Sequence, residues 1–376
     1  MRYSTPLIIL IVLVSTNVTS PANADVVVNG QTGPGALYRL VRPDNWNGRL
    51  FLYAHGYVST DEPVALPAEG QQLAELLASQ GFGVAYSSFS ENGWAVKDGA
   101  RRTWQLKNLF TSKFGKPTGV YVAGASMGGL IAIELAERYP SAFIGVLPAC
   151  SVAGGTRAQY DYFANVRAIF DVFYPGVLPG NAGDVSESVD TTLHIVLPAL
   201  AAMTGDPAGA GLLASVEQTP TPYTTPEELA QSIVTALASH AASFREFLPD
   251  LHYQPYFDNT STVYSGALPP EVIPFLNASV GRFSASPSAL NYMSKHYEPT
   301  GRIDVPMLML SNARDPVVPG FHQAIYDQLS TNAGSGDLLV QRTVDRYGHC
   351  LFTPDELASA IFDLVAWVEL GVKPKQ

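Results

Sequence analysis

Short apolar runs alternate with amphipathic segments along the first part of the chain. The apolar runs have the length of strands, and the segments between them carry apolar residues at helical spacing. Strands are expected at residues 36–41, 50–54, 84–86, 119–123 and 144–147. Helices are expected at residues 70–79, 100–114 and 128–139. This alternation is typical of βαβ units, so it predicts a mostly parallel sheet of the α/β class.

A turn signal separates the first two of these strands. Asn45-Trp46-Asn47-Gly48 contains an Asn-Gly step, which favours a tight β-hairpin. The pattern therefore predicts a hairpin between the strands at 36–41 and 50–54.

The alternation stops between residues 151 and 302. Helical patterns occupy 162–173, 191–203 and 227–247, and joints rich in Pro and Gly separate them. Alternation then resumes with strands at 306–310 and 338–344 and helices at 321–329 and 356–370. We therefore expect a core of residues 25–150 and 303–376 and a helical cap of residues 151–302. A long insertion between two strands commonly lies over a site as a lid.

Residues 1–24 have the pattern of a signal peptide. Arg2 provides a positive charge, residues 7–14 are apolar, and Ala22-Asn23-Ala24 forms a cleavage site of the A-x-A type. The alternative, an uncleaved anchor, needs an apolar run of about 20 residues, far longer than this one. Cleavage after Ala24 predicts a secreted or periplasmic protein that has no membrane span after processing.

Composition narrows the classes of function further. The chain has a formal net charge of −11 and no run of Lys or Arg, which disfavours nucleic acid as a partner. No H-E-x-x-H, clustered Cys and His, G-x-G-x-x-G or P-loop pattern is present, so neither a metal nor another cofactor is expected. The oligomeric state has no signature in the sequence.

The strongest chemical motif is Gly124-Ala125-Ser126-Met127-Gly128, which matches G-x-S-x-G. A predicted strand precedes it and a predicted helix follows it. In this context Ser126 lies on a sharp turn, where glycines at positions 124 and 128 avoid collisions. We interpret Ser126 as a nucleophile; an ordinary Gly-rich loop is the alternative.

A serine nucleophile needs a base to accept its proton. Of the seven histidines, only His349 follows the last predicted strand, in Tyr347-Gly348-His349. The other histidines lie in the cap, on the preceding helix or in a different motif. We therefore assign His349 as the base.

The base in turn needs an acid that fixes its tautomer. Asp315 directly follows the strand at 306–310 and so lies at the carboxyl edge of the sheet. Asp345 is the rival, but it lies four residues before His349, and we interpret it as a solvated loop residue. The resulting order is Ser126, Asp315, His349.

An oxyanion intermediate needs two preorganised donors. The backbone N–H of Met127 follows the nucleophile and is the first. The strand at 50–54 leads into His55-Gly56-Tyr57, and we assign the N–H of Tyr57 as the second donor. His55 is then expected to brace the loop. Residues 87–90 and Trp94 are further candidates for lining a pocket, with ordinary loop residues as the alternative.

Outside residues 151–302, the chain resembles the α/β-hydrolase superfamily. The resemblance rests on His55-Gly56, Gly124–Gly128, Asp315 and Gly348-His349. It implies an eight-stranded, mostly parallel sheet with a cap inserted after the sixth strand, where the insertion of this chain starts.

The two cysteines are Cys150 and Cys350, and in an exported protein two thiols often pair. His349-Cys350 resembles the histidine end of the tannase and feruloyl-esterase pattern, in which a disulfide joins residues adjacent to the catalytic Ser and His. The chain departs from that pattern because Ala125 precedes Ser126. We instead expect a bridge between Cys150 and Cys350; two buried free thiols are the alternative.

These features predict a hydrolase that cleaves a carboxylic ester, small or polymeric, through an acyl-enzyme. The aromatic and Leu content of residues 151–302 suggests an apolar or aromatic substrate group. Amide or peptide hydrolysis by the same triad is the alternative within enzymes. A binding protein on an inactive core of this kind is the alternative outside enzymes.

Overall fold

The computed structural model describes residues 25–375, so the predicted signal peptide lies outside the described residues. One sheet of eight strands has the order β1-β2-β4-β3-β5-β6-β7-β8. β2 is antiparallel to β1 and β4, and the pairs from β4 to β8 are parallel. The strands are β1 (Val26–Thr32), β2 (Ala36–Arg42), β3 (Arg49–Ala54), β4 (Gly83–Ser87), β5 (Gly119–Ala125), β6 (Gly145–Ala149), β7 (Met307–Arg314) and β8 (Leu339–Tyr347).

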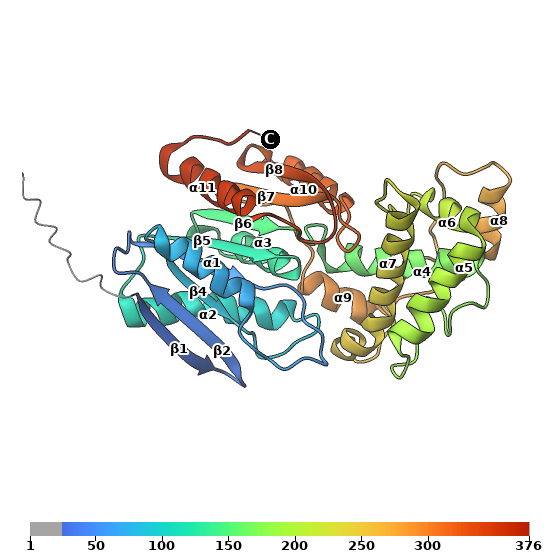
Figure 1. The fold of residues 1–376 in the computed structure, drawn as a ribbon, viewed down its shortest axis with the longest axis horizontal. Helices are drawn as coiled ribbons and strands as arrows, with labels where there is room; N and C mark the ends of the chain where they lie inside the picture. The colour runs from blue at the N-terminus through green and yellow to red at the C-terminus, as the bar shows by residue number, and fades with distance from the viewer. Residues whose placement is uncertain (1–24, 376) are drawn as a thin grey trace, which may run out of the picture.

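Helices cover both faces of this sheet (Figure 1). One face packs against α1 (Ala68–Ser79) and α11 (Pro354–Leu370). The other face packs against α2 (Val96–Phe114), α3 (Met127–Arg138) and α10 (Phe321–Ala333). The α/β fold class predicted from the alternation is therefore confirmed.

The strand β3 shows why the sheet needs two layers of helices. Leu50 and Leu52 belong to the apolar cluster on the α2–α3 face, whereas Phe51 and Tyr53 belong to the cluster on the α1–α11 face. Successive side chains of a strand point to opposite faces. A strand that is apolar at every position is therefore stable only when both faces are buried.

Residues 151–302 lie between β6 and β7 and form mainly helices; we call them the cap. Figure 1 shows most of these helices as a lobe beside the core, with α9 between the lobe and the sheet. The cap helices are α4 (Gly155–Phe173), α5 (Leu197–Gly205), α6 (Pro207–Ala214), α7 (Pro226–Glu246), α8 (Val272–Ser279) and α9 (Pro287–Lys295). A π-helical turn, Thr192–Val196, precedes α5.

Within residues 25–375, no single helix has the length and apolarity needed to cross a membrane. A bent pair, Thr192–Gly205 with Pro207–Ala214, passes the same test only when the two helices are taken together.

The predicted hairpin at Asn47-Gly48 is wrong. β4 lies between β2 and β3 in the sheet, and β2 instead makes its hairpin with β1, a strand that the sequence patterns did not predict. The Asn47 N–H donates to the carbonyl of Gly81, and the Gly48 carbonyl accepts from Thr118, so this segment joins neighbouring loops. Hydrogen bonds to other loops override the local turn preference.

Candidate active site

Ser126 lies on the turn between β5 and α3, in a backbone conformation that is rare for a residue with a side chain. Its φ is 56° and its ψ is −121°. Such a conformation costs about 1–3 kcal/mol and persists only where the surroundings impose it. Here the Ser126 N–H donates to the Ala149 carbonyl at 2.9 Å, and the Ser126 carbonyl accepts from the Gly129 N–H at 2.9 Å. The neighbouring strand and the helix thus hold the hydroxyl at the carboxyl edge of the sheet.

The two glycines of the motif are required by close approaches of the backbone. A Cβ on residue 124 would lie 2.0 Å from the carbonyl oxygen of Gly128. A Cβ on residue 128 would lie 2.1 Å from the carbonyl oxygen of Ala54. Both contacts involve backbone that cannot move aside without distorting the turn. Gly124 and Gly128 therefore permit the fold of the turn that presents Ser126.

Three side chains from three different loops meet at this edge. The Nε2 of His349 lies 2.8 Å from the Oγ of Ser126, and its Nδ1 lies 2.7 Å from the Oδ2 of Asp315. Asp315 is buried, and its Oδ1 accepts hydrogen bonds from the N–H groups of Val317 and Val318, each at 2.9 Å. A carboxylate held in this way can accept a hydrogen bond from the Nδ1–H group of His349, which leaves Nε2 free to accept the proton of Ser126.

Asp345, the rival acid, lies elsewhere. Its side chain is 86% exposed and pairs with Arg314. It makes no hydrogen bond to His349 among the described residues, whereas Asp315 does.

The turn that carries His349 is held by backbone and side-chain contacts to β7. The Gly348 N–H donates to the Arg314 carbonyl at 2.9 Å. The buried side chain of Asn312 donates to the Leu351 carbonyl at 2.9 Å and accepts from the Leu351 N–H at 3.1 Å. Sequence patterns did not single out Asn312, because a buried amide in a strand has no periodic signature. Its position at the end of a strand, three residues before Asp315, is the signal that could have found it.

The disulfide between Cys150 and Cys350 is present, which confirms the predicted bridge and removes the alternative of free thiols. It joins the end of β6 to the turn after β8, across 200 residues of sequence. Ligand atoms of Cys150, His349 and Cys350 lie within 4.8 Å of one another. Because both sulfurs are bonded to each other, they offer no thiolate to a metal ion.

The two backbone donors assigned to an oxyanion flank Ser126. Met127 is the first residue of α3, where N–H groups have no partner within the helix. The loop that carries Tyr57 approaches the turn so closely that a Cβ on Gly56 would lie 3.3 Å from the Cβ of Ser126. In the described part of the chain, neither the Met127 nor the Tyr57 N–H has an acceptor. Both amides are therefore available to a ligand.

His55 packs beneath this loop. It is buried, its ring stacks on Phe89 with centroids 3.8 Å apart, and its Nδ1 lies 2.7 Å from the Gly56 carbonyl oxygen. Burial lowers the pKa of His55, which favours the neutral ring. This placement fits a bracing role, because the ring makes no hydrogen bond to Ser126, Asp315 or His349 among the described residues.

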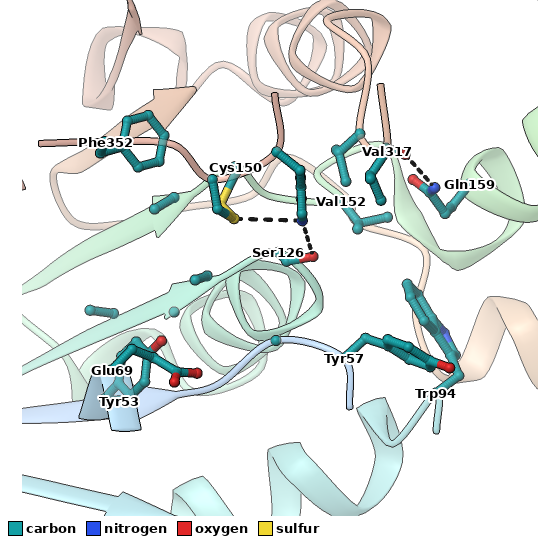
Figure 2. A pocket seen from close by; sticks show the side chains of 18 of the residues that line it. Tyr53, Tyr57, Glu69, Trp94, Ser126, Cys150, Val152, Gln159, Val317 and Phe352 are labelled. Atoms are coloured by element: carbon teal, nitrogen blue, oxygen red, sulfur yellow. Dashed lines mark hydrogen bonds between the residues drawn. A yellow bond between two sulfur atoms is a disulfide. The ribbon is translucent and has the colours of Figure 1, made fainter. Parts of the chain in front are cut away.

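Ser126 and His349 line a cavity of about 1290 Å³ that extends to either side of Ser126. We call the part between α1 and α11 the core arm and the part beneath the cap the cap arm. Figure 2 places Ser126 between residues of the two arms, with Tyr53, Glu69 and Phe352 on one side and Tyr57, Trp94 and Gln159 on the other. The candidate Trp94 therefore lines the cavity. Residues 87–90 do not line the cavity, so that part of the prediction is wrong. The hydroxyls of the three serines among them donate to the Leu37 carbonyl, the Phe89 carbonyl and the Asp98 carboxylate.

Comparisons with known proteins show which solved structures share the fold of this chain. No protein-family model matches the sequence, and no curated protein is significantly similar to it. Feruloyl esterase B from Aspergillus oryzae is similar in structure, with a TM-score of 0.54 and 13% identity, over 93% of this chain and 82% of that chain. An esterase from Aspergillus oryzae gives 0.51 and 13%, over 93% of this chain and 80% of that chain.

At this identity the likeness establishes the fold and nothing finer. Together with the sheet order and the helical layers, it shows that the chain has the α/β-hydrolase fold. The resemblance inferred from the sequence motifs is confirmed at this level. The activity has to be argued from the site.

Proposed function

We propose that the chain is a serine hydrolase that cleaves carboxylic esters, with Ser126 as nucleophile, His349 as base and Asp315 as acid. The observation that carries the proposal is the continuous hydrogen-bonded series from Ser126 through His349 to Asp315, at 2.8 and 2.7 Å. These distances are within the reach that proton transfer requires.

The reaction proceeds in two halves. His349 Nε2 accepts the Ser126 proton as Oγ attacks the acyl carbon, and the N–H groups of Met127 and Tyr57 bind the oxyanion. The bond from the acyl carbon to the alcohol oxygen breaks, and the alcohol leaves with the proton from His349. Water then attacks the acyl-enzyme with His349 as base, and the acid is released as Ser126 regains its proton.

The shape of the cavity supports a substrate with sizeable groups on both sides of the ester. Apolar residues line most of the core arm, among them Leu73, Leu76 and Ile361. Aromatic residues line part of the cap arm, beside the charged residues Arg245 and Glu246. An apolar acyl or alcohol group gains free energy when it enters such a site. The cap supplies one wall of this cavity, which supports a role for it as a lid over Ser126.

Hydrolysis of a p-nitrophenyl ester series from acetate to palmitate tests the proposal. Wild type is expected to hydrolyse at least part of the series, and Ser126→Ala is expected to lose about 10³–10⁶-fold in kcat. Ser151→Ala is the matched control, because Ser151 is buried, lies next to Gly129 at the start of α3, and makes no hydrogen bond to His349 among the described residues. Equal rates for wild type and Ser126→Ala on every ester would contradict the proposal, and amides would be tested next.

A further inference from the structure

The cap arm contains a buried side-chain amide whose orientation is fixed. Gln159 lies on α4, is 1% exposed, and lines the cavity. Its Nε2 donates to the carbonyl oxygen of Val317 at 2.8 Å. Because a carbonyl oxygen can only accept, the amide nitrogen must face Val317, and Oε1 takes the other position of the amide, which lies on the side of Ser126 in Figure 2. The usual ambiguity between the two ends of a glutamine amide is therefore resolved here.

The oxygen of this amide has no partner. Among the described residues, no group donates a hydrogen bond to Gln159 Oε1, although the atom is buried. Buried amide oxygens in proteins almost always accept at least one hydrogen bond, from another protein group or from an ordered water. Figure 2 shows Gln159 across Val152 and Val317 from Ser126, on the side of the cavity that the cap forms.

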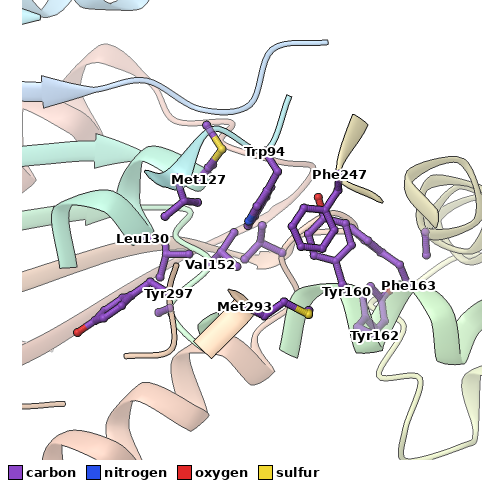
Figure 3. Packing of buried hydrophobic residues seen from close by; sticks show 14 of the residues in the cluster. Trp94, Met127, Leu130, Val152, Tyr160, Tyr162, Phe163, Phe247, Met293 and Tyr297 are labelled. Atoms are coloured by element: carbon purple, nitrogen blue, oxygen red, sulfur yellow. The ribbon is translucent and has the colours of Figure 1, made fainter. Parts of the chain in front are cut away.

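Aromatic residues form part of the wall of the cap arm, among them Trp94, Tyr160 and Phe163. Tyr160 contacts Trp94 edge to face, with ring centroids 5.1 Å apart, and stacks on Phe247 at 4.0 Å (Figure 3). The polar atom of Trp94 is already used, since its Nε1 donates to Thr156 Oγ1 at 3.1 Å. Ser243, which also lines the cavity, bonds to the His240 carbonyl and to Tyr256.

We propose that Gln159 Oε1 accepts a hydrogen bond from the substrate and selects esters whose group in the cap arm carries a hydroxyl or N–H donor on an otherwise apolar, flat framework. This inference rests on the proposed ester hydrolysis. A group without a donor leaves the oxygen unpaired, and a group that offers an acceptor, such as an ether oxygen, places two acceptors against each other. The expected order of preference is hydroxyl, then hydrogen, then methoxy. A site built around a donor discriminates more strongly than an apolar pocket does.

The test uses two matched sets of esters, because either side of the ester can occupy the cap arm. One set is p-nitrophenyl 3-phenylpropanoate and its para-hydroxy and para-methoxy forms. The other is 2-phenylethyl acetate and its para-hydroxy and para-methoxy forms. In one of the sets, kcat/KM of wild type is expected to be about 10–100-fold higher for the hydroxy ester than for the unsubstituted one.

The variant Gln159→Met keeps the length of the side chain and removes the acceptor, so the ratio of the two kcat/KM values is expected to fall to near one. Gln231→Met, an exposed glutamine on α7 outside the cavity, is the matched control and is expected to keep the wild-type ratio. A structural defect alone would lower the rates of all the esters together and leave their ratio unchanged. If Gln159→Met does not fold, the ratio of kcat/KM for the hydroxy and unsubstituted esters, measured in wild type, tests the proposal by itself.

The possible failures are distinguishable. Hydrolysis of both sets by wild type without preference for the hydroxy esters would overturn the role of Gln159 and leave the proposed ester hydrolysis intact. A preference that Gln159→Met retains would also overturn it. No hydrolysis above the level of Ser126→Ala would overturn both proposals.

Discussion

On the core side of the cavity, the carboxylate of Asp315 is surrounded by donors from Val317, Val318 and His349, whereas on the cap side Gln159 and Glu246 each keep one oxygen without a partner among the described residues. The core side derives its groups from the ends of sheet strands, and backbone contacts hold them before any ligand arrives. On the cap side, the proposed partner of Gln159 Oε1 is a group of the substrate, so that hydrogen bond would form only when a ligand enters. We infer that the two sides divide the work, the core supplying reactivity and the cap supplying selection.

The largest effect expected from this division is the loss of the acid. Asp315→Asn keeps the shape of the side chain and removes its charge, so His349 is no longer held in the tautomer that accepts the Ser126 proton. A loss of about 10⁴-fold in kcat is expected. Asp345→Asn is the matched control and is expected to leave kcat unchanged, since Asp345 is exposed and pairs with Arg314. Similar losses in the two variants, measured with one ester, would contradict the assignment of the acid.

The next effect concerns the stability of the core side. The Cys150–Cys350 bridge closes a loop of 200 residues, and the chain-entropy account gives such a bridge about 5 kcal/mol of stabilisation. Replacing both cysteines by serine is expected to lower the free energy of unfolding by up to that amount, as measured by urea titration. Because Asn312 also holds the His349 turn, kcat of the folded variant is expected to fall far less than in Asp315→Asn. An unchanged urea midpoint would show that the bridge adds nothing to stability.

The smallest effect concerns Glu246 at the end of α7. Its Oε1 accepts from Ser59 Oγ at 3.0 Å and from Arg245 at 2.9 Å, so it links the cap to the loop that follows Tyr57. Burial raises the pKa of Glu246 from 4.5 to about 7. Between pH of about 4.5 and about 7, Glu246 is therefore protonated in the folded protein but ionised in the unfolded chain. Through this residue, the free energy of unfolding falls as the pH rises across that range.

Glu246→Gln removes that pH dependence. The free energy of unfolding of the variant, relative to wild type, is expected to increase between pH 5 and pH 8 in urea titrations. Glu62→Gln is the control, because Glu62 is exposed and lies near the same loop. Parallel pH profiles for wild type and Glu246→Gln would show that the carboxyl is not protonated in the folded protein.

The sequence patterns predicted most of the core because its strands are apolar at consecutive positions and its helices are long and periodic. β1 escaped prediction because it is an edge strand that alternates between exposed and partly buried positions and contributes little to the core. The hairpin predicted at Asn47-Gly48 was wrong for a different reason. Hydrogen bonds from this segment to Gly81 and Thr118 determine its conformation.

Some residues of the candidate site could be predicted from the sequence, and others could not. Ser126, Asp315 and His349 were predictable because each follows a strand, and strand ends meet at one edge of a parallel sheet. Gln159 was not predictable, because its importance lies in the direction of one oxygen relative to Val317, across the boundary between cap and core. The short helices α6, α8 and α9 escaped for a related reason, as packing within the cap stabilises helices too short to show a clear period.

The most direct test of the account is to label the folded, disulfide-bonded protein with a fluorophosphonate and locate the adduct by peptide mass spectrometry. The account predicts one adduct per chain, on the Oγ of Ser126, and none in Ser126→Ala. Slower labelling is expected in Asp315→Asn, in which the base is no longer oriented. Absence of labelling in folded wild type, or an adduct on a different serine, would contradict the claim that Ser126 is a nucleophile activated by His349.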